Sequence, residues 1–201
     1  MKLSLACGVP VGLLLLSAPV WAREIPLSSE PTLQRSWLDS SSLRWNVGSN
    51  IPLTEPTQPL DRARCKAEIL SANTDEERRV EGAGWMLVEP TRRAGALALV
   101  KGTQAFDGEC RPTAFQVFVF SEGQFAGTVA PQPMERQADG ELLQARVEDD
   151  GTVMADFARY RAKDPLCCPS RTATVSYRID HVGATPILLP ERISTDLLPT
   201  E

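Results

Sequence analysis

The residues with the clearest chemical potential are two adjacent cysteines, Cys167 and Cys168, with a proline two residues before the pair and another directly after it. Adjacent Cα atoms are about 3.8 Å apart, whereas bonded cysteines usually have Cα atoms roughly 4.4–6.8 Å apart. We therefore expect Cys65 and Cys110 each to bond one member of the pair. The alternative is a strained Cys167–Cys168 bond used as a redox switch, because strained disulfides are the more easily reduced ones.

His181 is the sole histidine, so a Ser–His or Cys–His mechanism would have to use it. It follows the end of a predicted strand and precedes Gly183, which indicates an exposed turn. The adjacent cysteines are poor partners for one zinc ion, which takes four ligands in a tetrahedral array. The sequence therefore predicts no catalytic residue, no metal site and no cofactor.

Clustered carboxylates could in principle form a hydrolytic pair. Glu148, Asp149 and Asp150 lie directly before Gly151, and this order is typical of a hairpin tip. Asp107 and Asp139 each precede a glycine, but neither has the ligand-rich spacing of a calcium loop. We expect turns at all three places.

The first 22 residues have the form of a signal peptide. Lys2 is followed by an apolar stretch over 3–16 and by small residues up to Ala22, where cleavage is predicted. The stretch is shorter than the roughly 20 residues that span a bilayer, and glycine and proline interrupt it. Cleavage would remove Cys7 and leave an even number of cysteines, which in an exported chain favours two disulfides with three alternative pairings. We expect a periplasmic or extracellular protein.

The composition is that of a folded, acidic protein. The 201 residues include 42% hydrophobic ones and carry a formal net charge of −5, which becomes −6 without Lys2. The basic residues are scattered, so neither a nucleic-acid site nor an anionic-membrane surface is predicted. No stable membrane span is expected after signal cleavage.

The chain divides into segments by composition. Residues 23–60 are rich in serine, threonine and proline and read as an N-terminal arm. Trp37 and Trp45 lie in this arm, and such large apolar side chains are expected to dock on the domain. Residues 61–192 form the predicted disulfide-stapled globular domain, and 193–201 a C-terminal tail.

The predicted fold class is α+β and mostly β: an antiparallel, meander-like sheet with a short helix and two disulfides. Thr74 and Glu77 have the spacing of a capping box that starts a helix over 75–81. The stretch 115–120 is apolar on both faces, which favours a central strand. The other strands are expected at 85–88, 96–100, 124–129, 142–147, 152–160, 173–179 and 187–189.

Three blocks of sequence carry a resemblance. They are Phe106–Pro112, Phe118–Thr128, and Phe157–Tyr160 together with Asp164–Ser170, which is the segment Asp-Pro-Leu-Cys-Cys-Pro-Ser. They resemble a family of uncharacterised exported bacterial proteins, and the Phe-x-x-Gly-x-x-x-Gly-Thr hairpin is more distantly similar to that of LppP/LprE-type lipoproteins. The resemblance implies a cell-envelope location, no established enzymatic activity and no catalytic residues.

From these observations we expect an exported, non-enzymatic domain that binds a protein, a peptide or an envelope component. One alternative is a thiol/disulfide redox protein that uses Cys167 and Cys168. The other is a purely structural component of the envelope.

Overall fold

The computed structural model describes residues 36–40, 44–48, 50–54 and 59–198. All of these residues belong to the unit Leu33–Glu201. The expected signal peptide, the first part of the N-terminal arm and residues 199–201 lie outside the described residues. Within the described ranges, no helix is long and apolar enough to cross a membrane.

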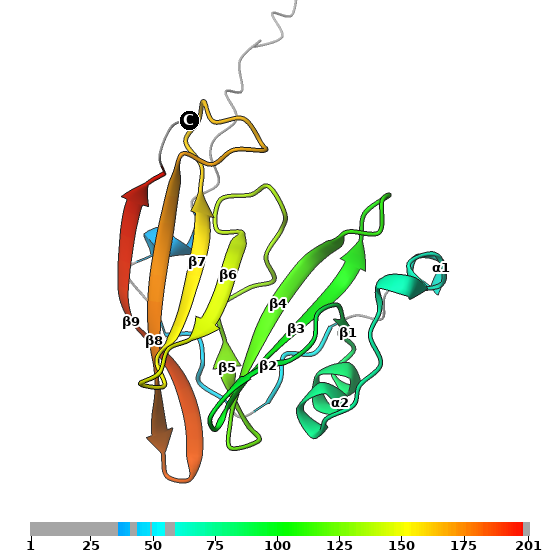
Figure 1. Cartoon of the computed structure of the whole chain (residues 1–201), viewed down its shortest axis with the longest axis vertical. Helices are drawn as coiled ribbons and strands as arrows, with labels where there is room; N and C mark the ends of the chain where they lie inside the picture. Colours follow the sequence, from blue (N-terminus) through cyan, green and yellow to red (C-terminus); the bar gives the residue numbers. More distant parts are fainter. Residues whose placement is uncertain (1–35, 41–43, 49, 55–58, 199–201) are drawn as a thin grey trace, which may run out of the picture. The chain divides into compact units, whose positions relative to one another are not determined.

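The first sheet is an antiparallel meander (Figure 1). Its strands are β1 (Met86–Leu87), β2 (Arg92–Ala94), β3 (Leu97–Phe106), β4 (Pro112–Ser121) and β5 (Gln124–Thr128). Strand β4 pairs with β3 and β5, while the short β1 and β2 pair with different parts of β3. The β4–β5 turn holds Glu122 and Gly123 at φ 51° and 76°, a conformation that glycine adopts freely. The hairpin predicted here is confirmed.

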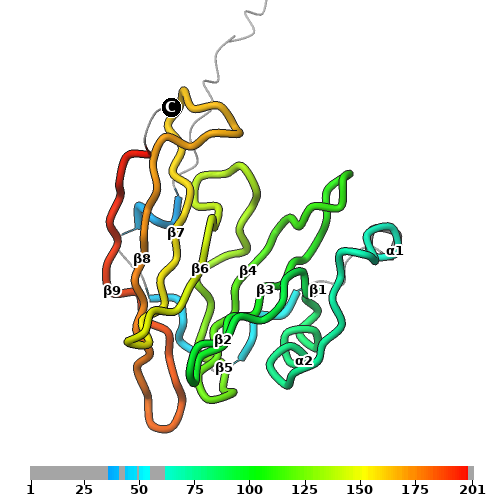
Figure 2. Tube along the Cα trace, in the orientation of Figure 1, coloured from blue at the N-terminus to red at the C-terminus, as the bar shows by residue number. Residues whose placement is uncertain are grey.

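The second sheet is also an antiparallel meander, in the order β6 (Leu142–Val147), β7 (Val153–Arg159), β8 (Arg171–Val182) and β9 (Thr185–Leu197). Figure 2 follows the chain from the first sheet into the second. The expected antiparallel, mostly β fold with a short helix is confirmed. The division into two sheets was not evident from the pattern, because each sheet alone has the same alternation of strands and turns.

Strand β9 is longer than expected. The sequence predicts a strand at 187–189 and a tail from 193, whereas β9 continues to Leu197. Residues 193–197 pair with residues 171–175 of β8, although most of them are exposed. This segment is held by its backbone hydrogen bonds to β8 and not by buried side chains. Its sequence therefore need not show the alternating apolar pattern by which strands are recognised.

In the part of the chain that the structure describes, the longest helix is α2 (Asp75–Gly82), which begins with the expected capping box. The hydroxyl of Thr74 accepts the N–H of Glu77 at 3.3 Å, and the Glu77 carboxylate accepts the N–H of Thr74 at 3.0 Å. Among the described residues before α2, three short turns of helix occur: η1 (Trp37–Asp39), α1 (Pro59–Arg64) and η2 (Lys66–Glu68).

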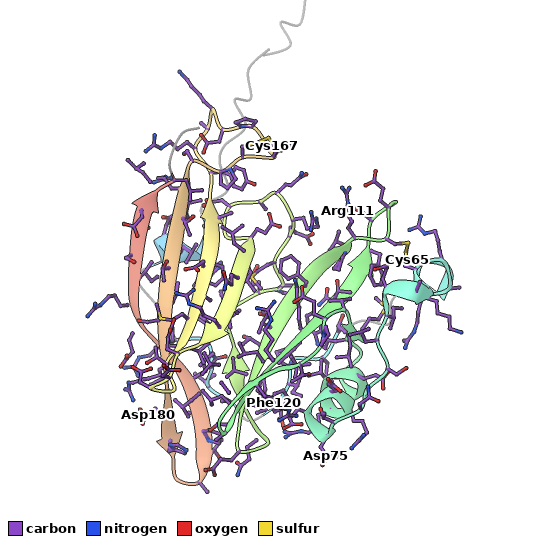
Figure 3. All side chains as sticks on the ribbon, viewed as in Figure 1. Cys65, Asp75, Arg111, Phe120, Cys167 and Asp180 are labelled. Atoms are coloured by element: carbon purple, nitrogen blue, oxygen red, sulfur yellow. A yellow bond between two sulfur atoms is a disulfide. The ribbon has the colours of Figure 1, made fainter. Side chains whose placement is uncertain are left out.

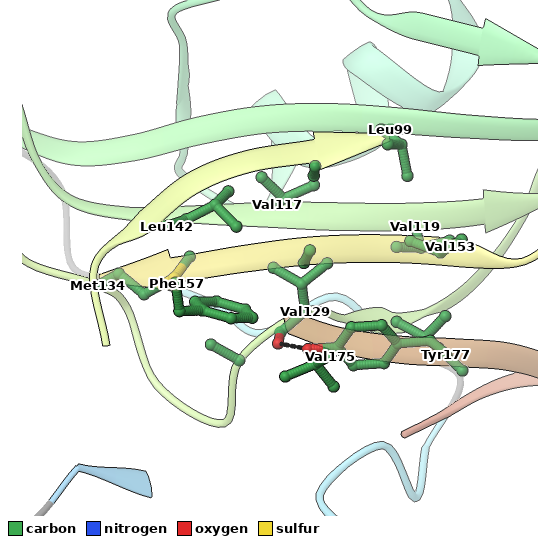
Figure 4. Packing of buried hydrophobic residues seen from close by; sticks show 14 of the residues in the cluster. Leu99, Val117, Val119, Val129, Met134, Leu142, Val153, Phe157, Val175 and Tyr177 are labelled. Carbon is green, nitrogen blue, oxygen red and sulfur yellow. Dashed lines mark hydrogen bonds between the residues drawn. The ribbon is translucent and has the colours of Figure 1, made fainter. Parts of the chain in front are cut away.

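The main hydrophobic core lies between the two sheets (Figure 4). Val119 of β4, Phe157 of β7 and Tyr177 of β8 are all fully buried in it. The Tyr177 hydroxyl donates to the carbonyl of Val129 at 2.5 Å, which satisfies its polar end. Burial raises the pKa of Tyr177 well above its ordinary value.

The opposite face of β4 packs towards α2. Phe118 and Phe120 are fully buried there with Val80 of the helix, and the Phe118 ring lies 5.0 Å from that of Trp85. Strand β4 is therefore central and covered on both faces, as its continuous apolar run predicts.

The described parts of the N-terminal arm dock on this domain. The ring of Trp37 meets the rings of Phe157 and Trp45 edge-on, at 5.0 and 5.2 Å. The indole N–H of Trp45 donates to the carbonyl of Thr128 at 3.0 Å. The expected docking of the two tryptophans is confirmed.

Asn46 of the arm bridges an edge of each sheet. Its side-chain NH₂ donates to the carbonyls of Thr128 in β5 at 3.0 Å and Leu188 in β9 at 2.9 Å. Its side-chain oxygen accepts the N–H of Thr128 at 2.9 Å. One partly buried amide thus stabilises the approach of β5 to β9.

Candidate functional site

The pairing of the cysteines differs from the expected one. Cys65 is bonded to Cys110, with Cα atoms 5.3 Å apart, and Cys167 is bonded to Cys168, with Cα atoms 3.8 Å apart. The prediction that Cys65 and Cys110 each bond one member of the adjacent pair was wrong. The vicinal alternative is the pairing found.

The fold explains this pairing. Cys65 lies between α1 and η2, and the β3–β4 turn brings Cys110 to it beside Met86 and Phe106. The adjacent pair instead lies on the loop between β7 and β8, at one end of the second sheet. Figure 3 shows Cys65 and Cys167 on different parts of the domain. The usual Cα separation of bonded cysteines favoured the two long-range pairings. The positions of the elements in the fold instead determine which cysteines lie close enough to bond.

The two disulfides lie in opposite environments. Cys65 is 1% exposed and belongs to a small hydrophobic cluster, whereas Cys167 and Cys168 are both exposed. Leu166, directly before the pair, is 67% exposed. The vicinal disulfide is therefore accessible to another molecule, whereas the long-range disulfide is buried at Cys65 and only partly exposed at Cys110.

Asp164 fixes the two ends of the loop that carries the vicinal disulfide. Its carboxylate accepts the N–H of Arg161 at 2.7 Å, the N–H of Ser170 at 3.0 Å and the hydroxyl of Ser170 at 2.7 Å. These hydrogen bonds, that from the Arg161 N–H first, lower the pKa of Asp164. The Tyr160 hydroxyl adds a bond to the carbonyl of Leu166 at 2.9 Å.

Below the loop, Arg159 forms a largely buried ion-pair network. It donates through Nε to Asp139 at 3.1 Å and through Nη2 to Asp39 at 2.7 Å, and its side chain is 9% exposed. Asp139 also accepts the N–H of Tyr160 at 2.7 Å. The sequence assigned Asp139 only to a turn, since nothing in its local pattern indicates a partner 20 residues away.

The histidine cannot assist the cysteines within one chain. Cys168 comes three residues before the start of β8 at Arg171, while His181 is the last residue but one of that strand. At about 3.3 Å per residue, they lie on the order of 30 Å apart. Figure 3 shows Cys167 and Asp180 at opposite ends of the sheet. As expected, His181 is exposed beside a hairpin turn.

The carboxylate clusters lie in turns, as expected. The N–H of Glu148 donates to the carbonyl of Thr152 at 2.8 Å across the β6–β7 hairpin, where Gly151 has φ 82°. Asp107 caps the β3–β4 turn, and its bonds from the N–H and side chain of Arg111 lower its pKa to about 2. Across the part of the chain that the structure describes, no group of three or more His, Cys, Asp or Glu is placed to hold a metal ion.

A cleft lies between β6 and the first sheet. Its wide part has a volume of about 360 Å³, and its apolar lining is Val88, Pro112, Phe115, Leu142 and Leu143. Lys101 and Glu89 form an ion pair at its wall, with Lys101 lying 4.8 Å from the centre of the Phe115 ring.

The cleft follows the free edge of β6. This strand pairs with β7 on one side, and among the described residues no strand pairs with its other side. At the narrow end of the cleft, Arg92 donates to the carbonyl of Ala145 at 3.1 Å, so this part of the edge is covered. At the wide end Leu143 is 50% exposed. The sequence identified β6 but could not show that it would be an edge strand.

Residues 93–181 match the family model of the LppP/LprE lipoproteins. No curated protein and no solved structure matches the chain. The matched span contains most of both sheets and the vicinal disulfide, and it begins after Cys65. The match supports the resemblance seen in the sequence and suggests an exported protein of the cell envelope. It supplies no catalytic residue.

Proposed function

We propose that the chain is an exported, non-enzymatic domain of the cell envelope that binds a segment of a partner protein in the cleft between its two sheets. The match to a lipoprotein family supports the envelope location. The signal sequence read over 1–22 supports export to the periplasm or beyond.

The observation that carries the proposal is the open end of β6. An edge strand offers unpaired backbone groups with which an extended segment can form hydrogen bonds. Here the edge adjoins a cleft of about 360 Å³ in which Leu143 is half exposed. Side-chain pockets next to a free strand edge are the arrangement by which extended peptides are recognised.

The chemistry of the cleft describes the segment that fits it. The floor provided by Phe115 and Leu142 favours an apolar side chain. Glu68, Glu89 and Glu141 line the same hollow together with two cations, Lys101 and Arg136, which leaves an excess of one carboxylate, and the chain as a whole has a net charge of −5. A segment with basic residues on either side of the apolar one is therefore favoured by charge.

A displayed library of twelve-residue peptides, selected on the mature protein, tests this proposal. We expect enriched peptides that carry apolar and basic residues. Leu143→Lys places a charge in the cleft and should weaken their binding at least tenfold. Leu166→Lys is the matched control, because it makes the same change at another exposed leucine, on the vicinal-disulfide loop, and should leave binding unchanged. Amide chemical shifts should move around Leu143.

Peptides that bind both variants equally, or a library that yields no binder, would contradict the proposal. Self-association of the protein without any enriched peptide would instead favour the purely structural role in the envelope.

A further inference from the structure

We propose that Cys167–Cys168 is a thiol–disulfide exchange site that accepts two electrons from a dithiol protein, whereas Cys65–Cys110 is a structural bond. This activity is separate from binding in the cleft. It rests on two differences between the two disulfides, in exposure and in the size of the closed loop, and on the hydrogen bonds that hold the backbone around the vicinal pair.

Exposure decides which bond a reductant can reach. Thiol–disulfide exchange requires a thiolate to approach one sulfur of the disulfide directly. Cys167 and Cys168 are both exposed, while Cys65 is 1% exposed within a hydrophobic cluster and its partner Cys110 is partly buried against the same cluster. The exposed Leu166 next to the pair offers an apolar contact for the reductant.

Loop size decides what reduction does to the fold. Cys65–Cys110 joins residues 45 apart, so its reduction releases a long loop in the unfolded chain and removes much entropic stabilisation. Cys167–Cys168 joins neighbours in the chain, so its reduction adds almost no conformational entropy to the unfolded chain. The vicinal bond can therefore open and close while the domain stays folded.

The loop backbone is held by bonds that do not depend on the disulfide. Asp164 fixes both ends of the loop through Arg161 and Ser170, and Tyr160 holds the carbonyl of Leu166. After reduction the two thiols remain adjacent in a tethered loop, which favours rapid closure when an oxidant arrives.

The exchange balances as follows. A thiolate of the dithiol attacks one sulfur of the Cys167–Cys168 bond, which breaks as a mixed disulfide forms. The other cysteine leaves as a thiolate and takes up a proton. The second thiol of the reductant, as its thiolate, then attacks the mixed disulfide and releases the second cysteine. The dithiol becomes a disulfide, and two electrons and two protons pass to Cys167 and Cys168.

Stepwise reduction of the mature protein with dithiothreitol, followed by alkylation of free thiols and peptide mapping, tests this proposal. We expect Cys167 and Cys168 to be alkylated at a dithiothreitol concentration at least tenfold below that needed for Cys65 and Cys110. The circular dichroism spectrum should not change during this first step. The double variant Cys167→Ala/Cys168→Ala should fold and show only the second step.

A single variant, Cys168→Ser, adds a second readout. Its free Cys167 should form a mixed disulfide with glutathione disulfide. This reaction measures the accessibility of the site while the Cys65–Cys110 disulfide stays intact. Reduction of both bonds at the same concentration, reduction of Cys65–Cys110 first, or no mixed disulfide on Cys167 would overturn the proposal. A peptide map with bonds from Cys65 or Cys110 to the adjacent pair would also overturn it.

Discussion

Arg159 on β7 and Asp39 on η1 are ion-paired at 2.7 Å although 120 residues separate them in the chain. The same guanidinium binds Asp139, whose side chain is 9% exposed. Both aspartates raise the pKa of Arg159 against the opposing effect of its burial. One arginine therefore links the N-terminal arm, the segment before β6 and the second sheet.

Removal of this arginine should destabilise the protein strongly. Arg159→Ala leaves Asp139 buried without its cation, and breaking a buried pair in this way costs about 3 kcal/mol of the free energy of unfolding. Denaturant unfolding at neutral pH measures this loss. Arg178→Ala is the control, because Arg178 and its partners Asp180 and Glu191 are about half exposed and should contribute nothing measurable. Equal stability of the two variants would argue against the buried network.

The two disulfides should differ in their contribution to stability. Cys65→Ala/Cys110→Ala removes a bond between residues 45 apart, and chain entropy predicts a loss of about 4 kcal/mol. Cys167→Ala/Cys168→Ala should change the midpoint of thermal unfolding by no more than a degree or two, on the order of the effect of a surface substitution. The prediction fails if removal of the vicinal pair is the more damaging change.

Local patterns in the sequence predicted most of the secondary structure. The Thr74 capping box and the Gly123 hairpin depend on neighbours three or four residues away, so local sequence determines them. The double-sided apolar run of β4 likewise reflects its own burial. Exposed β2 and the end of β9 were missed, since both are held by backbone pairing rather than by buried side chains.

The candidate sites were predicted less well. The adjacent cysteines were recognised as the residues with the clearest chemical potential, yet their pairing depends on the distance between two sheets that the sequence did not separate. The roles of Arg159 and of the β6 edge also come from contacts between distant segments. Charge and exposure at such places follow from tertiary packing, which a local pattern does not encode.

Gly127→Ala should loosen the docking of the arm. Gly127 has φ 150°, and a Cβ placed there would lie 2.3 Å from the side-chain carbon of Asn46. The amide that joins β5 to β9 would have to move, so we expect a loss of roughly 2 kcal/mol in the free energy of unfolding. Gly108→Ala is the matched control, because its added methyl group meets no atom within 4 Å. Faster hydrogen exchange at Thr128 would locate the damage, and unchanged exchange there would contradict this explanation.

The pairing of Glu76 with Arg93 should make stability depend on pH in the acid range. Arg93 donates two hydrogen bonds to the carboxylate, at 3.1 and 2.8 Å, and joins α2 to β2. These bonds lower the pKa of Glu76 from 4.5 to about 2, against the opposing effect of burial. The folded protein therefore holds the proton less tightly than the unfolded chain does.

This difference sets the sign of the pH effect. The stabilisation is fully present above pH 4.5 and is lost as the pH falls towards about 2. Glu76→Gln should lower the free energy of unfolding at pH 7 and flatten its decline between these values. Glu81→Gln, at an exposed position of the same helix, is the control and should keep the wild-type slope. Urea unfolding between pH 2 and pH 7 measures both. If the free energy of unfolding of Glu76→Gln falls with pH as steeply as that of the wild type, the acid dependence arises from other groups. The ion pair would then not couple α2 to the first sheet.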